Sequence, residues 1–286
     1  MDFTSLEARR KKCVSLVVVG IVLGVVAFLV MFGLYEYQFI GFIIAAVAAI
    51  FLGIGYFNFS KISTEFKNKY LRDLINNTFE DANYFPKRGV DVSQVYNSDL
   101  VKKADRHHTE DLITGKVEEV SFITSDVKLE ERRVRHTKNG TQVYYVTYFL
   151  GRFFEFDFPK DFKSKILVTE GSIFTWFSKY KKIELESVDF NKKFKTYTMN
   201  EHDTFYVLTP HLMESILKLE AHNPGSLGLT FTGNKLYILI NNNINTFELK
   251  LFRTIDMSVI KGLERDLSVI KEIVQELKLN RKIFVN

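Results

Sequence analysis

The densest group of side chains that could bind a metal ion lies at His107, His108, Glu110 and Asp111. Imidazole and carboxylate groups together can hold zinc or another transition metal. Adjacent histidines diverge in any regular element, however, and a structural metal site needs more ligands at defined spacing. We therefore favour a solvated loop before the first strand, and we expect no metal and no cofactor. His107, His108 and Asp111 remain the candidates if a metal binds, and His202, Asp203 and His211 form a second set.

Motifs that would identify an enzyme are missing from the sequence. It contains no GxxxxGK[ST] phosphate-binding loop, no HExxH and no GxSxG. Cys13 is the single cysteine, so disulfides within the chain and thiol catalysis in the later part are both excluded. Cys13 is either a passive residue or a lipidation site beside the membrane, and we favour the first. We expect no catalytic residues, and any cofactor-binding residues are unknown.

Two long apolar runs near the N-terminus determine where the rest of the chain, with its candidate residues, is located. They span Val14–Leu34 and Phe39–Phe57, and neither contains a charged residue. About 20 apolar residues suffice to cross a bilayer as a helix. A signal peptide would have a shorter apolar region, and a buried pair of soluble helices would each need a polar face. The runs therefore predict a transmembrane helical hairpin.

Basic residues at the ends of the hairpin predict its orientation. Arg9, Arg10, Lys11 and Lys12 precede the first run, Lys61 follows the second, and the short turn between the runs has no basic residue. Because basic flanks stay in the cytoplasm, we expect both termini there. The predicted organisation is a basic N-terminus (1–13), the hairpin (14–57), a helical juxtamembrane linker (58–104) and a cytoplasmic α+β domain (105–286).

Small residues recur at helical spacing inside both runs. They are Gly20 and Gly24 in the first run, and Gly41, Ala45, Ala49 and Gly53 in the second. Such residues allow two helix backbones to approach closely in lipid. They either pack the hairpin against itself, which we favour, or leave one face for self-association or another span. No Asp, Glu, Lys, Arg or His lies inside either run, which disfavours a two-span transporter or pump.

The remaining chain has the pattern of an α+β fold with a mostly antiparallel sheet. Apolar periodicity predicts helices at 61–85, 92–101 and 256–279, and Thr209-Pro210 begins another as N-cap and first helical residue. The last helix either docks on the sheet, which we favour, or joins a coiled coil. Asn139-Gly140 predicts a hairpin turn. The expected strands are 125–135, 142–153, 166–169, 183–186, 194–197, 227–231, 235–240 and 247–252, the pair around Thr232-Gly233-Asn234 forming a second hairpin.

Two features of the strand region have an alternative interpretation. Gly151, within an aromatic strand, indicates a bulge or a close approach of another backbone. The basic runs Arg132–Arg135 and Lys179–Lys182 could contact anionic lipid headgroups. The favoured alternative is that they are solvated strand edges or turns, where basic side chains discourage edge pairing.

Several stretches in order resemble the bacterial membrane proteins grouped as domain of unknown function 3137. The stretches are Tyr148–Phe154, Leu185–Phe194, Leu208–Glu214 and Leu229–Ile238, with Phe247-Glu248 downstream. The resemblance implies two N-terminal spans in a bacterial inner membrane followed by one α+β domain. It implies no known activity and no catalytic residues.

Two functions fit these observations. The first, which we favour, is a membrane-anchored binding or scaffold module whose partners are the lipid bilayer and a protein, or a second copy of itself. The second is an enzyme or ligand-binding domain for a small molecule near the membrane, which predicts a deep pocket with converging polar groups. The formal charge of +5, from 39 basic and 34 acidic residues, is spread along the chain, so we expect no nucleic acid.

Overall fold

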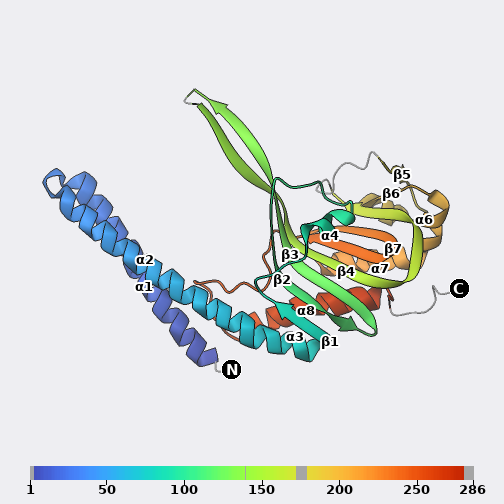
Figure 1. Cartoon of the computed structure of the whole chain (residues 1–286), viewed down its shortest axis with the longest axis horizontal. Helices are drawn as coiled ribbons and strands as arrows, with labels where there is room; N and C mark the ends of the chain where they lie inside the picture. Colours follow the sequence, from blue (N-terminus) through green and yellow to red (C-terminus); the bar gives the residue numbers. More distant parts are fainter. Residues whose placement is uncertain (1–2, 139, 172–178, 280–286) are drawn as a thin grey trace. The chain divides into compact units, whose positions relative to one another are not determined.

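The protein divides into two compact units. The computed structural model describes residues 3–138, 140–171 and 179–279. Unit 1 spans Met1–Asp73 and Phe247–Glu264, and unit 2 spans Leu74–Thr246 and Arg265–Asn286. Figure 1 labels the helices and strands of both units.

Unit 1 is built on a helical hairpin. Helix α1 (Phe3–Gly33) is followed by a 3₁₀ turn (η1, Tyr35–Tyr37) and by α2 (Gln38–Phe66). The second helix continues without a break through a π-helical turn (η2, Lys67–Leu71) into α3 (Arg72–Thr78). The helix expected at 61–85 is thus continuous with the helix of the second apolar run, and it ends at Thr78 rather than at residue 85.

The helices of the hairpin meet at small residues. A side chain at Gly20, Gly41 or Gly55 would collide with the opposite helix, and Ala48 is buried between them. Gly24 and Gly53 face open space, Ala45 is half-buried and Ala49 is exposed.

The spacing of Gly41, Ala48 and Gly55 explains which side of α2 forms this contact. A step of seven residues returns to nearly the same side of a helix, whereas each step of four turns the position by about 40°. The expected row Gly41, Ala45, Ala49 and Gly53 therefore leaves the contact as it proceeds along α2, and Gly53 points away from α1.

Both helices are long and apolar enough to cross a membrane. Only 22% of the most apolar window of α1, and 17% of that of the helix from Gln38 to Thr78, is buried. A core helix of a soluble protein would be mostly buried, whereas these helices expose large apolar side chains such as Phe28, Leu29 and Phe42. This surface is suited to lipid.

The polypeptide after residue 246 returns to the base of the hairpin within unit 1. Arg10 Nη1 donates a hydrogen bond of 2.6 Å to the Leu251 carbonyl oxygen, and the Ile255 N–H donates one of 2.9 Å to Glu7 Oε2. Lys67 also forms an ion pair with Glu248. The strand expected at 247–252 is wrong, because this segment consists of turns and irregular structure.

Unit 2 contains one antiparallel sheet of seven strands among the described residues. The strands are β1 (Glu80–Phe85), β2 (Arg106–Val117), β3 (Val120–Thr137), β4 (Gly140–Glu170), β5 (Lys181–Ile183), β6 (Phe194–Thr198) and β7 (Ser226–Asn241). They run in the order β1-β2-β3-β4-β6-β5, and β7 pairs with β4. The α+β class with a mostly antiparallel sheet is thus confirmed. The turn residue Asn139 lies outside the described residues.

Two strand predictions need correction. Residues 80–85 form β1 rather than helix, because they pair with β2 at the edge of the sheet. Residues 226–241 form one continuous strand, not a hairpin about Gly233. Gly233 has a φ of 54°, but the chain there bends beside an irregularity in β4 and resumes pairing with the same strand. The turn-forming residues Thr232-Gly233-Asn234 therefore form a bend within one strand and not the turn of a hairpin.

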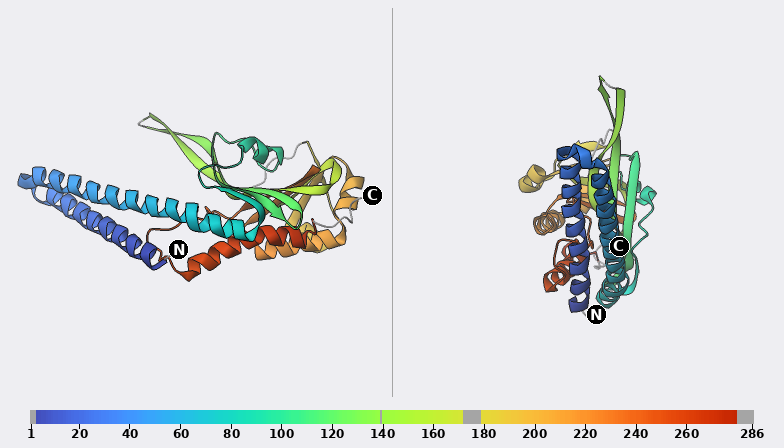
Figure 2. Two further views of the ribbon diagram at one scale, coloured as in Figure 1. Left: turned by 60° about the horizontal axis from the view of Figure 1, so that its bottom comes forward. Right: turned by 90° about the vertical axis from the view of Figure 1, so that its left-hand side faces the viewer.

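Helices cover both faces of the sheet, as Figures 1 and 2 show. Helix α4 (Val92–Asn97) packs on a face formed by Val127, Phe153 and Leu239. Helix α7 (Pro210–His222) and the unit 2 part of α8 (Met257–Glu276) cover the other face. Thr209 caps α7 by accepting the Leu212 N–H, as expected. The short helices α5 (Val188–Lys193) and α6 (Glu201–Val207) lie near β6.

Gly151 marks a close approach of the β4 and β7 backbones. A Cβ atom at Gly151 would lie 1.9 Å from the backbone carbonyl oxygen of Ile240. The interpretation as a close backbone approach is confirmed. Gly151 stands next to Arg152, so this contact also fixes the backbone that carries Arg152.

We expect Gly151→Ala to lower the free energy of unfolding by about 1–3 kcal/mol, because the backbone of β7 must move to admit a methyl group. Urea unfolding of the full chain in detergent, followed by near-ultraviolet circular dichroism, measures this change. Gly262→Ala is the matched control, since nothing lies within 4 Å of a Cβ there and alanine favours helix. Equal stabilities for Gly151→Ala and the natural protein would contradict the assignment.

Candidate functional site

A buried row of polar side chains crosses the sheet on the face covered by α7 and α8. Asp126 of β3 is the register partner of Arg152 of β4, which is in turn the partner of Ile240 of β7. Register partners in antiparallel strands point to the same face. Arg152 Nε lies 3.8 Å from Asp126 Oδ1 and donates a hydrogen bond of 2.9 Å to Thr124 Oγ1. The guanidinium also lies over the ring of Phe154.

Burial perturbs the acid of this row. Asp126 is 3% exposed and Arg152 5% exposed. Burial, which disfavours the charged carboxylate, raises the pKa of Asp126 to about 7, Asp111 adds to the rise, and Arg152 opposes it. The Thr246 N–H donates a hydrogen bond of 2.5 Å to Asp126 Oδ2, which also favours the ionised form. A buried carboxyl that titrates near neutral pH is typical of functional sites.

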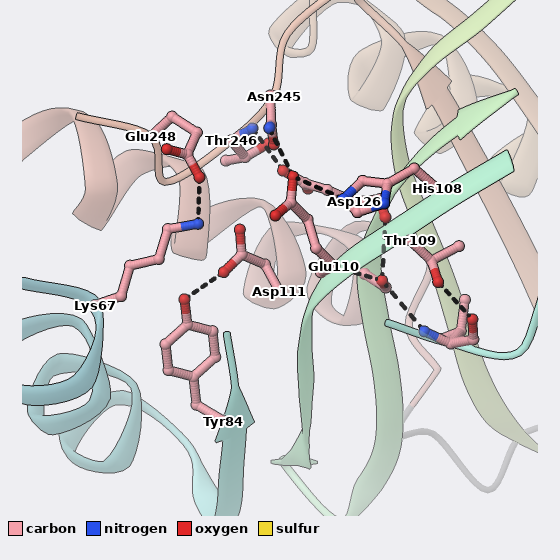
Figure 3. A network of polar contacts seen from close by, with 12 residues as sticks. Lys67, Tyr84, His108, Thr109, Glu110, Asp111, Asp126, Asn245, Thr246 and Glu248 are labelled. Atoms are coloured by element: carbon pink, nitrogen blue, oxygen red, sulfur yellow. Dashed lines mark hydrogen bonds and ion pairs between the residues drawn. The ribbon is translucent and has the colours of Figure 1, made fainter. Parts of the chain in front are cut away.

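The row continues toward β1 through Asp111. A bulge in β2 between Glu110 and Ile113, where Asp111 has a φ of 55°, turns this carboxylate inward until it is fully buried. The Tyr84 hydroxyl donates a hydrogen bond to it, as Figure 3 shows. Burial and the neighbouring Asp111 raise the pKa of Tyr84. Tyr84 therefore stays a neutral hydrogen-bond donor to Asp111.

The segment after β7 closes over the row. The Asn243 N–H donates to the Leu150 carbonyl oxygen at 2.9 Å, and Asn245 Nδ2 donates to Glu110 Oε1 at 2.8 Å. Asn243 has a φ of 56°, a conformation that asparagine tolerates better than most residues. These bonds hold Thr246 in place above Asp126.

A cavity of about 550 Å³ opens beside this row, entirely within unit 2. Arg152, Phe154, Ile240 and Thr246 form its buried part, and α8 supplies the opposite wall. The remaining lining residues are His222, Asn223, Pro224, Asn242, Ile244, Arg265, Asp266, Val269, Glu272 and Glu276. A volume of this size matches small-molecule sites, which combine apolar walls with a few polar groups.

Asp266 faces Arg152 across the cavity. Burial raises the pKa of Asp266, while Arg152 and Arg265 oppose the rise. The cavity thus offers a buried cation from the sheet and a carboxylate from the helix. A guanidinium binds carboxylate or phosphate, and a carboxylate accepts hydrogen bonds from an ammonium group. The arrangement can therefore orient a molecule that carries both kinds of group.

The residues expected as metal candidates lie on β2, not in a loop before the first strand. His107 and His108 are exposed and, as neighbours on a strand, point to opposite faces. His108 Nε2 lies 3.6 Å from Glu110 Oε1, His107 lies near Asp91, and Asp111 is buried against Tyr84. The structure therefore does not bring the three candidates together.

The second set also stays apart. His202 and Asp203 line a smaller cavity of about 270 Å³, in which Asp203 Oδ2 accepts a hydrogen bond from Ser164. His211 is exposed in the first turn of α7.

The basic flanks of the hairpin lie in unit 1 and are partly paired. Arg9 forms an ion pair of 2.7 Å with Glu65, and Arg10 is buried against Glu7. Lys61 lies over the ring of Phe57, whereas Lys11 and Lys12 are exposed. Cys13 is buried in the hairpin.

Sequence reasoning missed Arg152, Asp126 and Asp266, although each left a signal. Arg152 interrupts an otherwise apolar and aromatic stretch, Tyr148–Phe154, in which a charge must be buried. Asp266 lies directly before Leu267 in the apolar stripe of α8, three residues after Leu263. Thr246 could not be found from pattern, because its role depends on its backbone N–H.

Comparison with known proteins gives a family match over part of the chain and no function. A search of curated proteins and a search of solved structures found no match to this chain. Residues 147–279 match the family described as "Protein of unknown function (DUF3137)". The matched segment includes Arg152, Thr246 and Asp266, and Asp111 and Asp126 precede it. In this segment the chain is similar to a protein family of unknown function, and in this chain two apolar helices precede the segment.

Proposed function

We propose that this protein is a membrane-anchored binding module whose α+β unit holds a small amphoteric molecule, one with both an anionic and a cationic group. The observation that carries the proposal is the pair Arg152 and Asp266 on opposite walls of a 550 Å³ cavity. This favours the ligand-binding alternative for unit 2 while keeping the membrane as the site of action.

The anchor is supported by unit 1. Two charge-free apolar runs lie in helices that expose large apolar side chains, and basic residues flank the runs but not the turn between them. Under the positive-inside rule this arrangement leaves both termini, and with them unit 2, in the cytoplasm. In a bacterium the membrane would be the inner one.

The charges of the cavity support the ligand class. Arg152 is the buried cation, and it favours a carboxylate or phosphate at the inner end. Asp266, Glu272 and Glu276 supply acidic groups along α8, suited to an ammonium group nearer the opening. Phe154, Ile240 and Val269 would contact an apolar portion between the two. An amino acid or a short peptide end has this distribution of groups.

A thermal-shift panel tests the proposal. Full-length protein in detergent is heated with each of the common amino acids, with dicarboxylates and with diamines, all at 10 mM. A ligand at 100 times its Kd stabilises the folded state by about 2.7 kcal/mol, which moves the melting temperature by several degrees. We expect at least one amphoteric compound to raise it, and dicarboxylates and diamines to have smaller effects.

Val269→Trp and Val188→Trp form a matched pair for this panel. Val269 lines the cavity, so an indole there fills the space, whereas Val188 is exposed on α5 outside the cavity. The shift is expected to disappear in Val269→Trp and to persist in Val188→Trp. A panel without any shift in the natural protein, or a shift that survives in Val269→Trp, would refute the cavity as the site.

A further inference from the structure

The hairpin of β3 and β4 extends beyond the rest of the sheet as a two-stranded ribbon, which Figures 1 and 2 show. We define the ribbon as residues 131–138 and 140–146. Strand β2 pairs with β3 only as far as Glu130, and β7 pairs with β4 only from Gly151 onward. At about 3.3 Å per residue, the ribbon is roughly 20–25 Å long. Among the described residues, no other strand pairs with it.

The ribbon is strongly basic. Arg132, Arg133, Arg135 and Lys138 lie on it, and its one acid, Glu131, sits at its root. Glu131 forms ion pairs with Lys102 at 2.8 Å and with Arg133 at 3.3 Å. From Arg132 outward, the described part of the ribbon therefore carries four positive charges and no negative one.

Exposed apolar and aromatic side chains lie among these charges. Val134, Val143, Tyr144 and Tyr145 are each 42–44% exposed. The register places Arg132 opposite Tyr145, Val134 opposite Val143, and Arg133 opposite Tyr144. Because neighbouring pairs alternate between the two faces, each face presents both an arginine and a tyrosine. Neither face is purely polar.

A solvated edge explains only part of this composition. Basic side chains do discourage pairing with another sheet edge. Charged side chains alone would keep another sheet edge from pairing with the ribbon, however, and exposed valines and tyrosines favour such pairing. A two-stranded hairpin without a covered face is also marginally stable in water. The tyrosines and valines therefore indicate a surface that the ribbon contacts.

We infer that the ribbon lies on the surface of an anionic membrane. Tyrosine is enriched at the level of lipid headgroups, and arginine and lysine near the cytoplasmic leaflet are attracted by anionic lipids. The inference rests on the proposed membrane anchor, which keeps the bilayer at a high effective concentration beside unit 2. An acidic protein or a nucleic acid would satisfy the charges as well, but nothing in the chain keeps either within reach.

Hydrogen exchange of the full chain in nanodiscs tests this inference. Nanodiscs of phosphatidylcholine alone are compared with nanodiscs that contain a third of phosphatidylglycerol. We expect amides 131–146 to exchange at least tenfold more slowly in the anionic discs, and the amides of α7 to be unchanged. Equal exchange of the ribbon in both lipids would overturn the inference. The inference would also be overturned if the ribbon amides exchanged more slowly with added polyglutamate or single-stranded DNA than with the anionic discs.

Two charge-reversed variants sharpen the test. Arg132→Glu/Arg133→Glu/Arg135→Glu is expected to abolish the difference between the lipids. Lys87→Glu/Lys163→Glu/Lys195→Glu makes the same change of charge at exposed residues outside the ribbon and is expected to keep it. If the second variant loses the difference as completely as the first, only net charge matters and the ribbon has no special role.

A failure of the membrane anchor can be distinguished from a failure of the ribbon inference. A chain that does not co-elute with nanodiscs contradicts the membrane anchor and not the ribbon. Flotation of the same chain with preformed vesicles of the two compositions then tests the ribbon directly. At least tenfold more chain floating with the anionic vesicles supports the inference, and equal flotation overturns it.

Discussion

Replacing Arg152 by methionine is expected to lower the free energy of unfolding by about 3–5 kcal/mol at pH 8. Methionine has a similar length but no charge, so the Asp126 carboxylate beside it would be left buried without its cation. Removing one partner of a buried ion pair costs this much because the other charge remains desolvated. Urea unfolding of the full chain in detergent, followed by near-ultraviolet circular dichroism, gives the value.

A double-mutant cycle separates this pair from simple loss of packing. Asp126→Asn/Arg152→Met removes both charges, so it should be less destabilised than the sum of the two single variants. The cost of Arg152→Met alone should also shrink at pH 5, where the Asp126 carboxyl is protonated. Additive effects that do not depend on pH would show that the two side chains do not interact.

Replacing Asp126 by asparagine is expected to change how stability depends on pH. The pKa of Asp126 is raised from 3.8 to about 7 in the folded protein, so between these values the folded chain holds a proton that the unfolded chain has released. This contribution to stability is complete below pH 4 and is lost as the pH rises through 7. At 1.36 kcal/mol per pKa unit, the natural protein should lose about 4 kcal/mol over this range relative to Asp126→Asn.

The measurement is the difference in unfolding free energy between Asp126→Asn and the natural protein at pH 4, 5, 6, 7 and 8. Other titrating groups are common to both proteins and cancel in the difference. Asp189→Asn serves as the control, because the Asp189 side chain is 84% exposed and its replacement should give a small, flat difference. A flat difference for Asp126→Asn too would mean that the carboxyl is ionised throughout the range.

The elements that the sequence predicted well are those with strong local signals. The apolar runs, the cap at Thr209 and the apolar stripe of α8 each produced the expected helix, because propensity, capping and periodicity agree there. The predicted strands 125–135 and 142–153 lie within β3 and β4.

The errors arose where pairing with distant strands decided the outcome. Residues 80–85 continue a helical pattern but form β1, since the hydrogen bonds of the β2 edge are available to them. Gly233 has the composition of a turn, yet β7 continues past it because β4 is long enough to pair with both halves. Segment 247–252 alternates like a strand but has no strand beside it among the described residues.

The candidate site could not be predicted from the sequence, again because segments distant in the chain form it. Asp126, Arg152 and Asp266 are separated by 26 and 114 residues along the chain, and only the register of β3 with β4 and the docking of α8 bring them together. The histidine pair attracted attention because its members are adjacent in sequence. Adjacent residues on a strand point to opposite faces of the sheet, so the two histidines diverge although they are neighbours in the sequence.

Calorimetric titration of the full chain, with the amphoteric compound that gives the largest thermal shift, decides whether the Arg152 cavity binds a ligand. We expect saturable binding with one site per chain in the natural protein and in Val188→Trp. We expect no measurable heat of binding in Val269→Trp. Equal binding by Val269→Trp, or no saturable binding by the natural protein, would contradict the claim that the Arg152 cavity is the binding site.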